Sequence, residues 1–412
     1  MSYLKKKISA LFLSKYQVIE NYFPITKKNL TNYFKEKVFF KDAKNTKGLY
    51  INFIITSKTE IRIFTPLLNY ILENNPEIKV SLFFAKQNLA FDSKLSKKIT
   101  ESKNVNYDSS PFNLIKFKKS VNVVCLDHTF YIKAHKLGIE IIDFLNRENL
   151  KTVCIQHGGN QDDYIKGQLS SKSKYQIVFG KLIFNRLLEY GFGSGKVYLT
   201  GNPLHDNLFS SNSNLKLDEN RKVISLVTCM HTEYDDRPDP KACYIEYLKN
   251  VYTSINFDDY QLVVKMHPYD NVLDNIYDVV SQDLKLADYD VRIIKSNDSN
   301  NSVYDIISAS DIVISRASTI IEEALMINKR VIAFDLFEDG NSQYYDFLLK
   351  YRNYEKVIGK AGNLRDIIAK SSSEAEDNLG DIDELVLNTT YKLDGKSTER
   401  IIRALKDISK IN

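Results

Sequence analysis

The sequence lacks the signatures of several common protein classes. It holds four cysteines, none in a CxxC spacing, which argues against a structural zinc site and predicts a reduced, cytoplasmic protein. No apolar run approaches the roughly 20 residues that a membrane-spanning helix needs. The apolar run Ile8–Leu13 is interrupted and has no small-residue cleavage site, so we expect no signal peptide.

Several catalytic and nucleotide-binding motifs are also missing. The sequence has no Walker loop and no GxGxxG after a predicted strand, which weakens the kinase and nicotinamide-cofactor interpretations. It has no GxSxG nucleophile elbow either. Despite a net charge of +5, it contains no DNA- or RNA-binding motif, and we therefore expect no nucleic-acid partner.

Lysines crowd the first fifty residues, with aromatic and apolar side chains between them. We interpret residues 1–47 as a basic, helical N-terminal extension. One hypothesis is that this segment rests on the anionic inner face of the cell membrane. The alternative is a solvated pair of helices that covers the first domain.

From Gly48 onward, short apolar strands alternate with amphipathic helices. One block is expected in 48–203, a polar Ser- and Asn-rich linker in 204–220, a second block in 221–390 and a C-terminal helix in 391–412. Such alternation predicts a parallel sheet with helices on both faces. The predicted fold is therefore α/β, with two Rossmann-like, doubly wound parallel-sheet domains that face each other across a cleft.

Residues 310–335 predict a strand, a tight turn, a helix and another strand. In the turn, Arg316 to Thr319, backbone N–H groups and the positive end of the helix dipole face the carboxyl edge of the sheet, where anions bind in open α/β sheets. The hydroxyls of Ser318 and Thr319 either cap the helix or hold a phosphate.

Further candidates for nucleotide binding lie in the same block. Glu322 and Glu323 follow one turn into the helix, where a carboxylate reaches a ribose hydroxyl. Lys265 and His267 end another predicted strand, lie on the same side of an extended segment and both suit a phosphate. Pro268 would begin the next helix and leave neighbouring amides free to donate. These residues predict the donor site.

The first block offers candidates for the acceptor side. His157 follows a strand and is succeeded by Gly158 and Gly159, which let a ligand approach the backbone. It either accepts a proton from a hydroxyl nucleophile near neutral pH or is a structural hydrogen-bonding residue. Gly201 and Asn202, in the sequence TGNP, either line the cleft with their backbone or form a simple turn.

Asp127 and His128, after the predicted strand Val121–Leu126, are further candidates for the edge of the cleft, and a solvated loop is their alternative. Asp127 is a second candidate for contact with the acceptor. The pair Asp235 and Asp236 has no partner at a metal-ligand spacing, so no metal site is predicted.

Together these motifs resemble glycosyltransferases and epimerases of the GT-B fold. TGNP looks like the inter-domain junction of hydrolysing UDP-N-acetylglucosamine 2-epimerases, and residues 318–335 are similar to the nucleotide-binding segment of that superfamily. QHG at 156–158, with HP at 267–268, resembles capsule Kdo transferases and CDP-glycerol glycerophosphotransferases, and DGKSTER at 394–400 resembles the tail of the latter. The paired glycines of the epimerase turn are replaced here by Ala317-Ser318-Thr319.

The resemblance implies that His157 is a base, that His267, Ser318 and Thr319 hold the donor phosphate, and that Glu322 or Glu323 holds the ribose. We expect a glycosyltransferase that moves a sugar from a CMP-, CDP- or UDP-linked donor to a glycan or lipid-linked acceptor of a surface polysaccharide such as capsule. The alternatives are a CDP-glycerol-type glycerophosphotransferase, a UDP-sugar 2-epimerase and a non-catalytic GT-B scaffold. No visible motif requires a cofactor.

Overall fold

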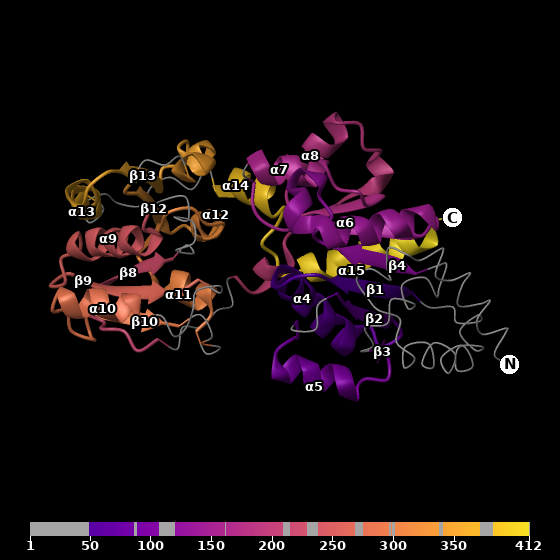
Figure 1. Ribbon diagram of the computed structural model, residues 1–412, viewed down its shortest axis with the longest axis horizontal. Coiled ribbons are helices and arrows are strands. Elements are labelled where there is room, and N and C mark those ends of the chain that lie inside the picture. The colour runs from indigo at the N-terminus through magenta and orange to yellow at the C-terminus, as the bar shows by residue number, and fades with distance from the viewer. Residues whose placement is uncertain are drawn as a thin grey trace. The chain divides into compact units, whose positions relative to one another are not determined.

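The computed structural model describes residues 49–85, 89–106, 120–160, 162–208, 215–228, 238–267, 275–295, 298, 301–337, 341–370 and 382–411. The predicted extension 1–47, Pro268 and the loop with Asp235 and Asp236 lie outside these residues. The chain divides into two compact units (Figure 1). The first contains the residues up to Asp206 and those from Asn388 onward, and the second contains Asn207–Leu387.

The first unit is built on a seven-stranded sheet in the order β3-β2-β1-β4-β5-β6-β7. All of its strand pairs are parallel. The order reverses next to β1, so the topological switch point, where ligands bind in such sheets, lies between β1 and β4. The strands are β1 Tyr50–Ile55, β2 Lys79–Phe84, β3 Val105–Asn106, β4 Val121–Val124, β5 Lys151–Ile155, β6 Tyr175–Val178 and β7 Val197–Leu199.

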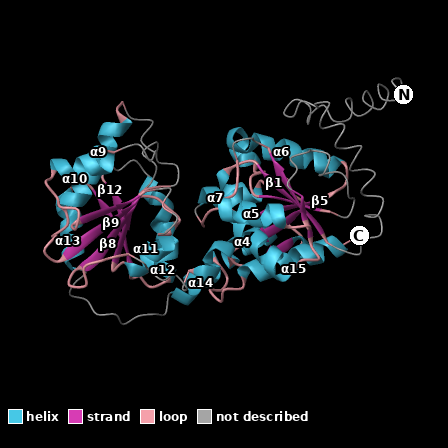
Figure 2. Ribbon diagram, turned by 90° about the horizontal axis from the view of Figure 1, so that it is seen from below, coloured by secondary structure: helices cyan, strands magenta, loops and turns pink. Residues whose placement is uncertain are grey.

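Helices cover both faces of this sheet (Figure 2). One face packs against α4 (Lys58–Asn74), α5 (Ser93–Glu101) and α15 (Ser397–Lys410), whose apolar residues join one buried cluster with the strands. The other face packs against α6 (Ile132–Arg147), α7 (Asp162–Leu169) and α8 (Lys181–Glu189).

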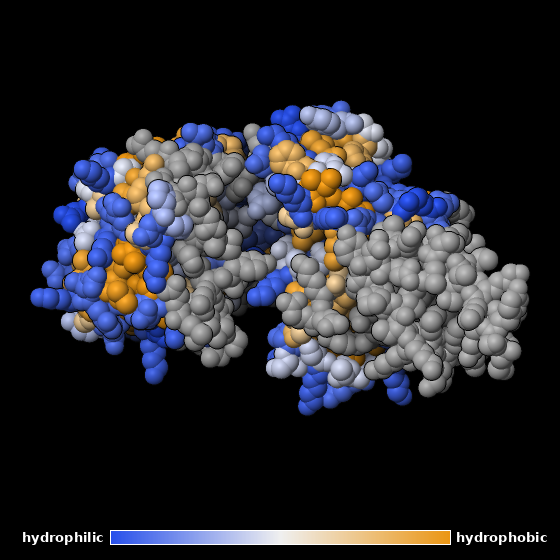
Figure 3. Space-filling model, in the orientation of Figure 1, coloured by the Kyte–Doolittle hydropathy of each residue, from blue (hydrophilic) through white to orange (hydrophobic). Residues whose placement is uncertain are grey.

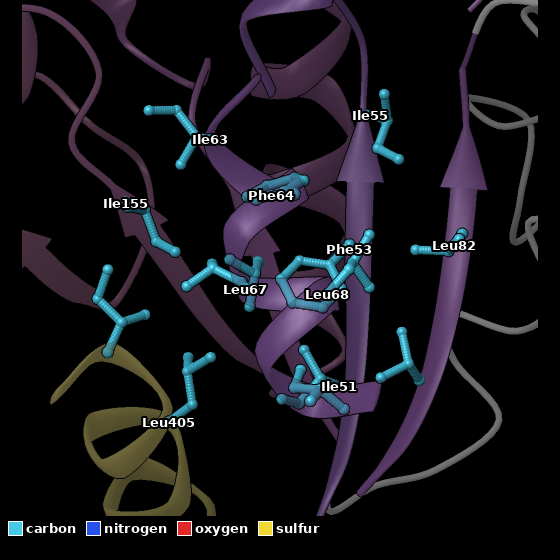
Figure 4. Close-up of a cluster of buried hydrophobic side chains, with 14 of the residues drawn as sticks. Ile51, Phe53, Ile55, Ile63, Phe64, Leu67, Leu68, Leu82, Ile155 and Leu405 are labelled. Carbon is cyan, nitrogen blue, oxygen red and sulfur yellow. The ribbon is translucent and has the colours of Figure 1, made fainter. Parts of the chain in front are cut away.

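The alternation of side chains along β1 shows why the segment is buried on both faces. Phe53 points into the cluster with α4, and its ring centroid lies 4.7 Å from that of Phe64 (Figure 4). The next residue, Ile54, belongs to the cluster under α6. A strand buried on both faces is mostly apolar rather than alternating, which explains the nearly continuous apolar run in the sequence, interrupted by the buried Asn52.

The final helix corrects the domain boundaries that the sequence predicted. Residues 391–412 were expected to form a separate C-terminal helix after the second domain. Instead, Leu405 of α15 is fully buried in the same cluster as Phe64 (Figure 4), and the chain from Asn388 onward belongs to the first unit. The many charged residues of this helix make it look like a separate, solvated helix in the sequence, so its packing on the first sheet was not predicted.

The second unit repeats the same topology with a six-stranded parallel sheet, in the order β10-β9-β8-β11-β12-β13. Its switch point lies between β8 and β11. The two predicted parallel-sheet α/β domains are therefore confirmed. The strands are β8 Lys222–Val227, β9 Tyr260–Lys265, β10 Val291–Ile294, β11 Ile312–Ser315, β12 Arg330–Asp335 and β13 Tyr354–Ile358.

One face of this second sheet packs against the helices α9 (Pro240–Thr253), α10 (Ile276–Asp283) and α13 (Ala361–Lys370). The opposite face packs against α11 (Val303–Ala309), and α12 (Ile320–Met326) follows β11. Helix α14 (Ile382–Thr389) leads back to the first unit. The sequence pattern did not indicate β3 and β13, both of which lie at sheet edges, and residues Asn341–Leu348 form a 3-10 segment.

Within the described residues, every helix is too short or too polar to cross a lipid bilayer. In the space-filling view, hydrophilic residues cover much of the described surface and apolar residues gather in separate patches (Figure 3).

A buried carboxyl group, that of Glu60, fills the switch point of the first sheet. Its Oε2 accepts hydrogen bonds from the backbone N–H and the hydroxyl of Thr56 and from the Ser57 N–H, while its Oε1 accepts one from the Cys125 N–H after β4. Glu60 is fully buried, and this burial raises its pKa to about 7 although all of these hydrogen bonds lower it. An internal carboxyl therefore occupies the helix N-terminus where a phosphate would otherwise bind.

We predict that Glu60 makes the stability of the first unit depend on pH. Since its pKa is raised on folding, the folded state holds the proton between about pH 4.5 and pH 7 while the unfolded state has lost it, and stability falls as the pH rises. The free energy of unfolding of the wild type, relative to Glu60→Gln, should drop by about 2 kcal/mol between pH 5 and pH 8. Urea titrations of both proteins at the two pH values measure this, and equal pH dependence in both would refute it.

Close packing of α6 on the end of β4 depends on Gly138. A Cβ placed on this glycine would lie 1.9 Å from the carbonyl oxygen of Leu126, which is backbone and cannot rotate away. The site therefore requires glycine even though the helix itself would prefer alanine.

Gly138→Ala should lower the free energy of unfolding by about 2 kcal/mol, because the cost of overpacking outweighs the gain of up to about 1 kcal/mol in helix propensity. Chemical denaturation measures the change. Gly193→Ala is the matched control: its φ is −62° and a Cβ there meets no atom within 4 Å. Its stability should change by less than about 0.5 kcal/mol. Equal stability of the two variants would contradict the packing described.

Candidate functional site

Three histidines meet at the carboxyl edge of the first sheet. His128 follows β4, His157 follows β5, and His135 lies in the first turn of α6. The His128 and His157 rings are stacked with centroids 5.0 Å apart, and the His135 centroid lies 5.1 Å from His128 and 5.5 Å from His157. One ring nitrogen of each lies within 4.8 Å of the others. We call these residues the histidine cluster.

Burial keeps all three imidazoles neutral near pH 7. It lowers the pKa of His128 to about 2, with further lowering by the neighbouring His157 and His135. It lowers the pKa of His157 to about 3, although a hydrogen bond with the Cys125 carbonyl acts in the opposite direction. Burial alone lowers the pKa of His135 to about 4. The cluster therefore presents unprotonated nitrogens, which act as proton acceptors or metal ligands.

The hydrogen bonds of the cluster are incomplete. The Nδ1 atoms of His128 and His157 are buried and have no hydrogen-bonding partner within the part of the chain that the structure describes. His135 Nδ1 accepts a long hydrogen bond of 3.3 Å from the His128 backbone N–H. His157 is partly exposed as a residue, whereas His128 and His135 are buried. His157 is thus the most exposed member of the cluster.

The sequence pointed to His157 and placed His128 at the same sheet edge, but it missed His135. The sequence contains a signal for His135: it follows His128 by seven residues, or two helical turns, at the start of a predicted helix. The short 3-10 segment Thr129–Tyr131 between β4 and α6, which sets this approach, could not be read from the sequence. Tyr164 of α7, whose ring stands edge-on to His157 at 5.9 Å, was missed as well.

Asp127 lies beside the cluster but is engaged within the protein. Its carboxylate accepts hydrogen bonds from the Ser171 hydroxyl at 2.8 Å, the Ser173 N–H at 2.8 Å and the Ser173 hydroxyl at 2.7 Å. It is fully buried, and this burial raises its pKa against the effect of those bonds. These contacts fix the segment before β6, so they argue against a direct contact of Asp127 with an acceptor.

The glycine after His157 is required by the backbone. Gly158 has a φ of +86°, and a Cβ there would come within 2.6 Å of the Tyr164 ring. Gln156 holds the loop in place: its Nε2 donates to the Gly158 carbonyl at 3.2 Å, and its Oε1 accepts from the Phe179 N–H at 2.7 Å. Gly159 is buried in the same loop. This turn presents His157 at the sheet edge.

The TGNP motif forms a structural clamp together with the C-terminal DGKSTER segment. The Asn202 N–H donates to the Thr390 hydroxyl at 3.0 Å, and a Cβ on Gly201 would lie 2.4 Å from the Ser397 hydroxyl. The Asp206 carboxylate accepts from the first two amides of α15, those of Ser397 and Thr398, at 2.7 and 2.8 Å. Both motifs thus hold α15 on the first unit.

The remaining residues of DGKSTER belong to the same clamp. The guanidinium of Arg400 donates to the Thr200 carbonyl and, through one nitrogen, to both oxygens of Asp394 at 2.9 Å. These contacts explain the motif without a ligand.

In the second unit, the turn after β11 contains the residues predicted to hold the donor phosphate. Ser318 and Thr319 are partly exposed, and the Ser318 hydroxyl accepts a long hydrogen bond of 3.4 Å from the Ile320 N–H. Thr319 makes no side-chain cap to α12. His267, at the end of β9, is also partly exposed, and its backbone N–H donates to the Thr228 hydroxyl at 2.8 Å.

Two of the predicted phosphate ligands are engaged in the interior of the second unit. Lys265 Nζ donates to the carbonyls of Lys295 at 3.0 Å and Asn301 at 3.3 Å, and burial lowers its pKa. Arg316 is 1 % exposed, with its Nε 3.7 Å from the buried carboxylate of Asp335. Both side chains are therefore enclosed within the second unit, which argues against direct contacts with a phosphate.

Glu322 and Glu323, predicted to hold a ribose, are also buried, at 1 % and 4 % exposure. Because both carboxylates are buried, a ribose would reach either of them only if the ligand entered the turn between β11 and α12.

Solved structures of similar fold span nearly the whole chain. The S. aureus MnaA–UDP structure matches with a TM-score of 0.58 and 16% identity, over 87% of this chain and 96% of that one. The UDP-GlcNAc 2-epimerase from Neisseria meningitidis bound to UDP-GlcNAc matches with a TM-score of 0.55 and 16% identity, over 87% and 100%. The wall teichoic acid polymerase TagF matches with a TM-score of 0.52 and 16% identity, over 96% and 98%.

These likenesses confirm the predicted GT-B type of fold, with epimerases and TagF among its neighbours. No curated protein matches the chain significantly. Residues 155–406, which include His157 and the second unit, match the family model described as UDP-N-acetylglucosamine 2-epimerase. Because this match spans more than half of the 412 residues, the chain belongs to the UDP-N-acetylglucosamine 2-epimerase family.

Proposed function

We propose that this protein is a UDP-sugar enzyme that inverts the configuration at C2 of a UDP-linked N-acetylhexosamine. The observation that supports this most strongly is the extent of the family match, which begins in β5 next to His157 and runs to α15. It favours the epimerase, an alternative in the sequence interpretation, over the glycosyltransferase that was first expected.

The chemistry of this reaction sets two requirements. The proton at C2 is not acidic, because no carbonyl group adjoins that ring carbon. Inversion therefore proceeds when a base removes the C2 proton while the bond from C1 to the diphosphate breaks, which leaves a C1–C2 double bond. UDP then adds back to C1, and a proton returns to the opposite face of C2. The enzyme must supply a base near C2 and stabilise the departing diphosphate.

His157 meets the first requirement. Its imidazole is neutral near pH 7, its Nδ1 has no hydrogen-bonding partner among the described residues, and the residue is the one member of the cluster that is partly exposed. A pKa of about 3 makes the ligand-free imidazole a weak base.

The second unit supplies the proposed diphosphate site. His267, Ser318 and Thr319 lie at the carboxyl ends of β9 and β11, around the switch point of the sheet, with partly exposed side chains. We propose that they bind the diphosphate and that Glu322 or Glu323 contacts the ribose. Lys265 and Arg316 act indirectly, because they fix the strand ends that carry these groups.

Transfer of a sugar or of glycerol phosphate is the second candidate. TagF covers 96% of this chain, a larger share than the two epimerase structures above, and the epimerase turn with paired glycines reads Ala317-Ser318-Thr319 here. In that case His157 would deprotonate a hydroxyl of a glycan or lipid-linked acceptor of the cell envelope. A cytoplasmic location, with residues 1–47 on the membrane surface, belongs to this second proposal.

Incubation with UDP-GlcNAc in heavy water, without an acceptor, separates the two candidates. Proton NMR should show the C2 epimer and deuterium at C2, because the base exchanges the abstracted proton with solvent. His157→Gln should slow this reaction by at least about 100-fold, the usual contribution of a general base.

His205→Gln is the control, since His205 lies outside the cluster and its Nε2 is paired with Asn202. If UDP-GlcNAc stays unchanged and undeuterated, and a nucleotide-linked donor is consumed only when an acceptor is added, the protein is a transferase.

A further inference from the structure

We infer that the histidine cluster is a binding site for a divalent transition metal ion, with Zn²⁺ as the best match. Its ligands are one ring nitrogen each from His128, His135 and His157, which lie within 4.8 Å of one another. This inference stands apart from the proposed reaction, because it concerns binding in the absence of substrate.

The distances are close to those of a zinc site. With Zn–N bonds of about 2.0–2.1 Å in tetrahedral geometry, ligand nitrogens stand about 3.3 Å apart. The cluster therefore has to contract by about 1.5 Å at most, through rotations of the rings. Gly167 leaves space beside His128, because a Cβ on this glycine would lie only 3.3 Å from the His128 Nδ1.

The hydrogen bonds around the cluster resemble those that orient metal-binding imidazoles. Such ligands usually donate their second N–H to a carbonyl or another polar group. His128 Nε2 lies 3.4 Å from the Cys154 sulfur, while the Nδ1 atoms of His128 and His157 are buried without a partner among the described residues. A metal ion would satisfy such unpaired nitrogens.

The three imidazoles are unprotonated at pH 7, which is the form that binds a metal ion. His135 has only to give up its 3.3 Å contact with the His128 N–H. Three imidazoles suit zinc, copper, iron or nickel better than magnesium or calcium, which prefer oxygen ligands.

A second set of ligands, formed by Asp127, His128 and Cys154, also lies within 4.8 Å. It is the weaker candidate. The Asp127 oxygens already accept three hydrogen bonds from the serines before β6. Burial, together with the neighbouring Asp127 and Cys125, raises the pKa of the Cys154 thiol well above its usual range, so the thiolate that binds metal is disfavoured.

Three protein ligands leave the fourth position of a zinc ion open. In a zinc site with three protein ligands, water or hydroxide takes this position. A metal on His157 also takes up the lone pair that the proposed reaction needs. Bound zinc should therefore inhibit epimerisation, which makes the cluster a metal-sensitive site.

The test uses the full chain without a polyhistidine tag, treated with EDTA, loaded with Zn²⁺ and dialysed. Elemental analysis should find about one zinc per chain. Co²⁺ in its place should give the strong visible absorption of a tetrahedral site. His135→Gln and His157→Gln should each reduce the bound metal at least tenfold, and His205→Gln should keep it.

Thermal unfolding of the metal-free variants shows whether they fold. If His135→Gln fails to fold, the partly exposed His157→Gln decides the result. Wild-type protein that retains no zinc, or variants that retain as much as the wild type, would overturn the inference. Because zinc is counted without substrate, this outcome is independent of whether UDP-GlcNAc is epimerised.

Discussion

Each sheet carries its candidate site residues at one edge because all of the described strand pairs within it are parallel. In a parallel sheet, the carboxyl ends of neighbouring strands meet at the same edge and the connections return over the faces. In the first unit this geometry brings His128, after β4, against His157, after β5. In the second it gathers His267 and the turn Arg316–Thr319 at the ends of β9 and β11.

Burial then decides which of these side chains remain available for chemistry. Asp127, Lys265 and Arg316 are charged residues at strand ends, yet each is enclosed and paired with groups of its own unit. Their partners are backbone carbonyls, hydroxyls and a buried carboxylate, which compensate part of the cost of removing a charge from water. Partly exposed and less completely paired side chains, such as those of His157 and Thr319, are left for a ligand.

Much of the fold could be predicted from the sequence, because buried parallel strands are continuous apolar runs separated by amphipathic helices. The short edge strands β3 and β13 lack that signal. The site was harder to predict for a physical reason: strand-end position is visible in the sequence, but the partner of each side chain is not. Lys265 and Arg316 therefore looked like phosphate ligands, His135 was missed, and DGKSTER, which holds α15 through Asp206, looked like a functional tail.

Binding of UDP by the full chain, measured by titration calorimetry, tests the central claim most directly, because a UDP-sugar enzyme with its diphosphate site at β9 and β11 must bind the nucleotide itself. The account predicts saturable binding of about one UDP per chain with a Kd below about 1 mM. It also predicts that Thr319→Val, which removes a proposed phosphate contact, weakens this binding. The absence of saturable heat at millimolar UDP would contradict the account.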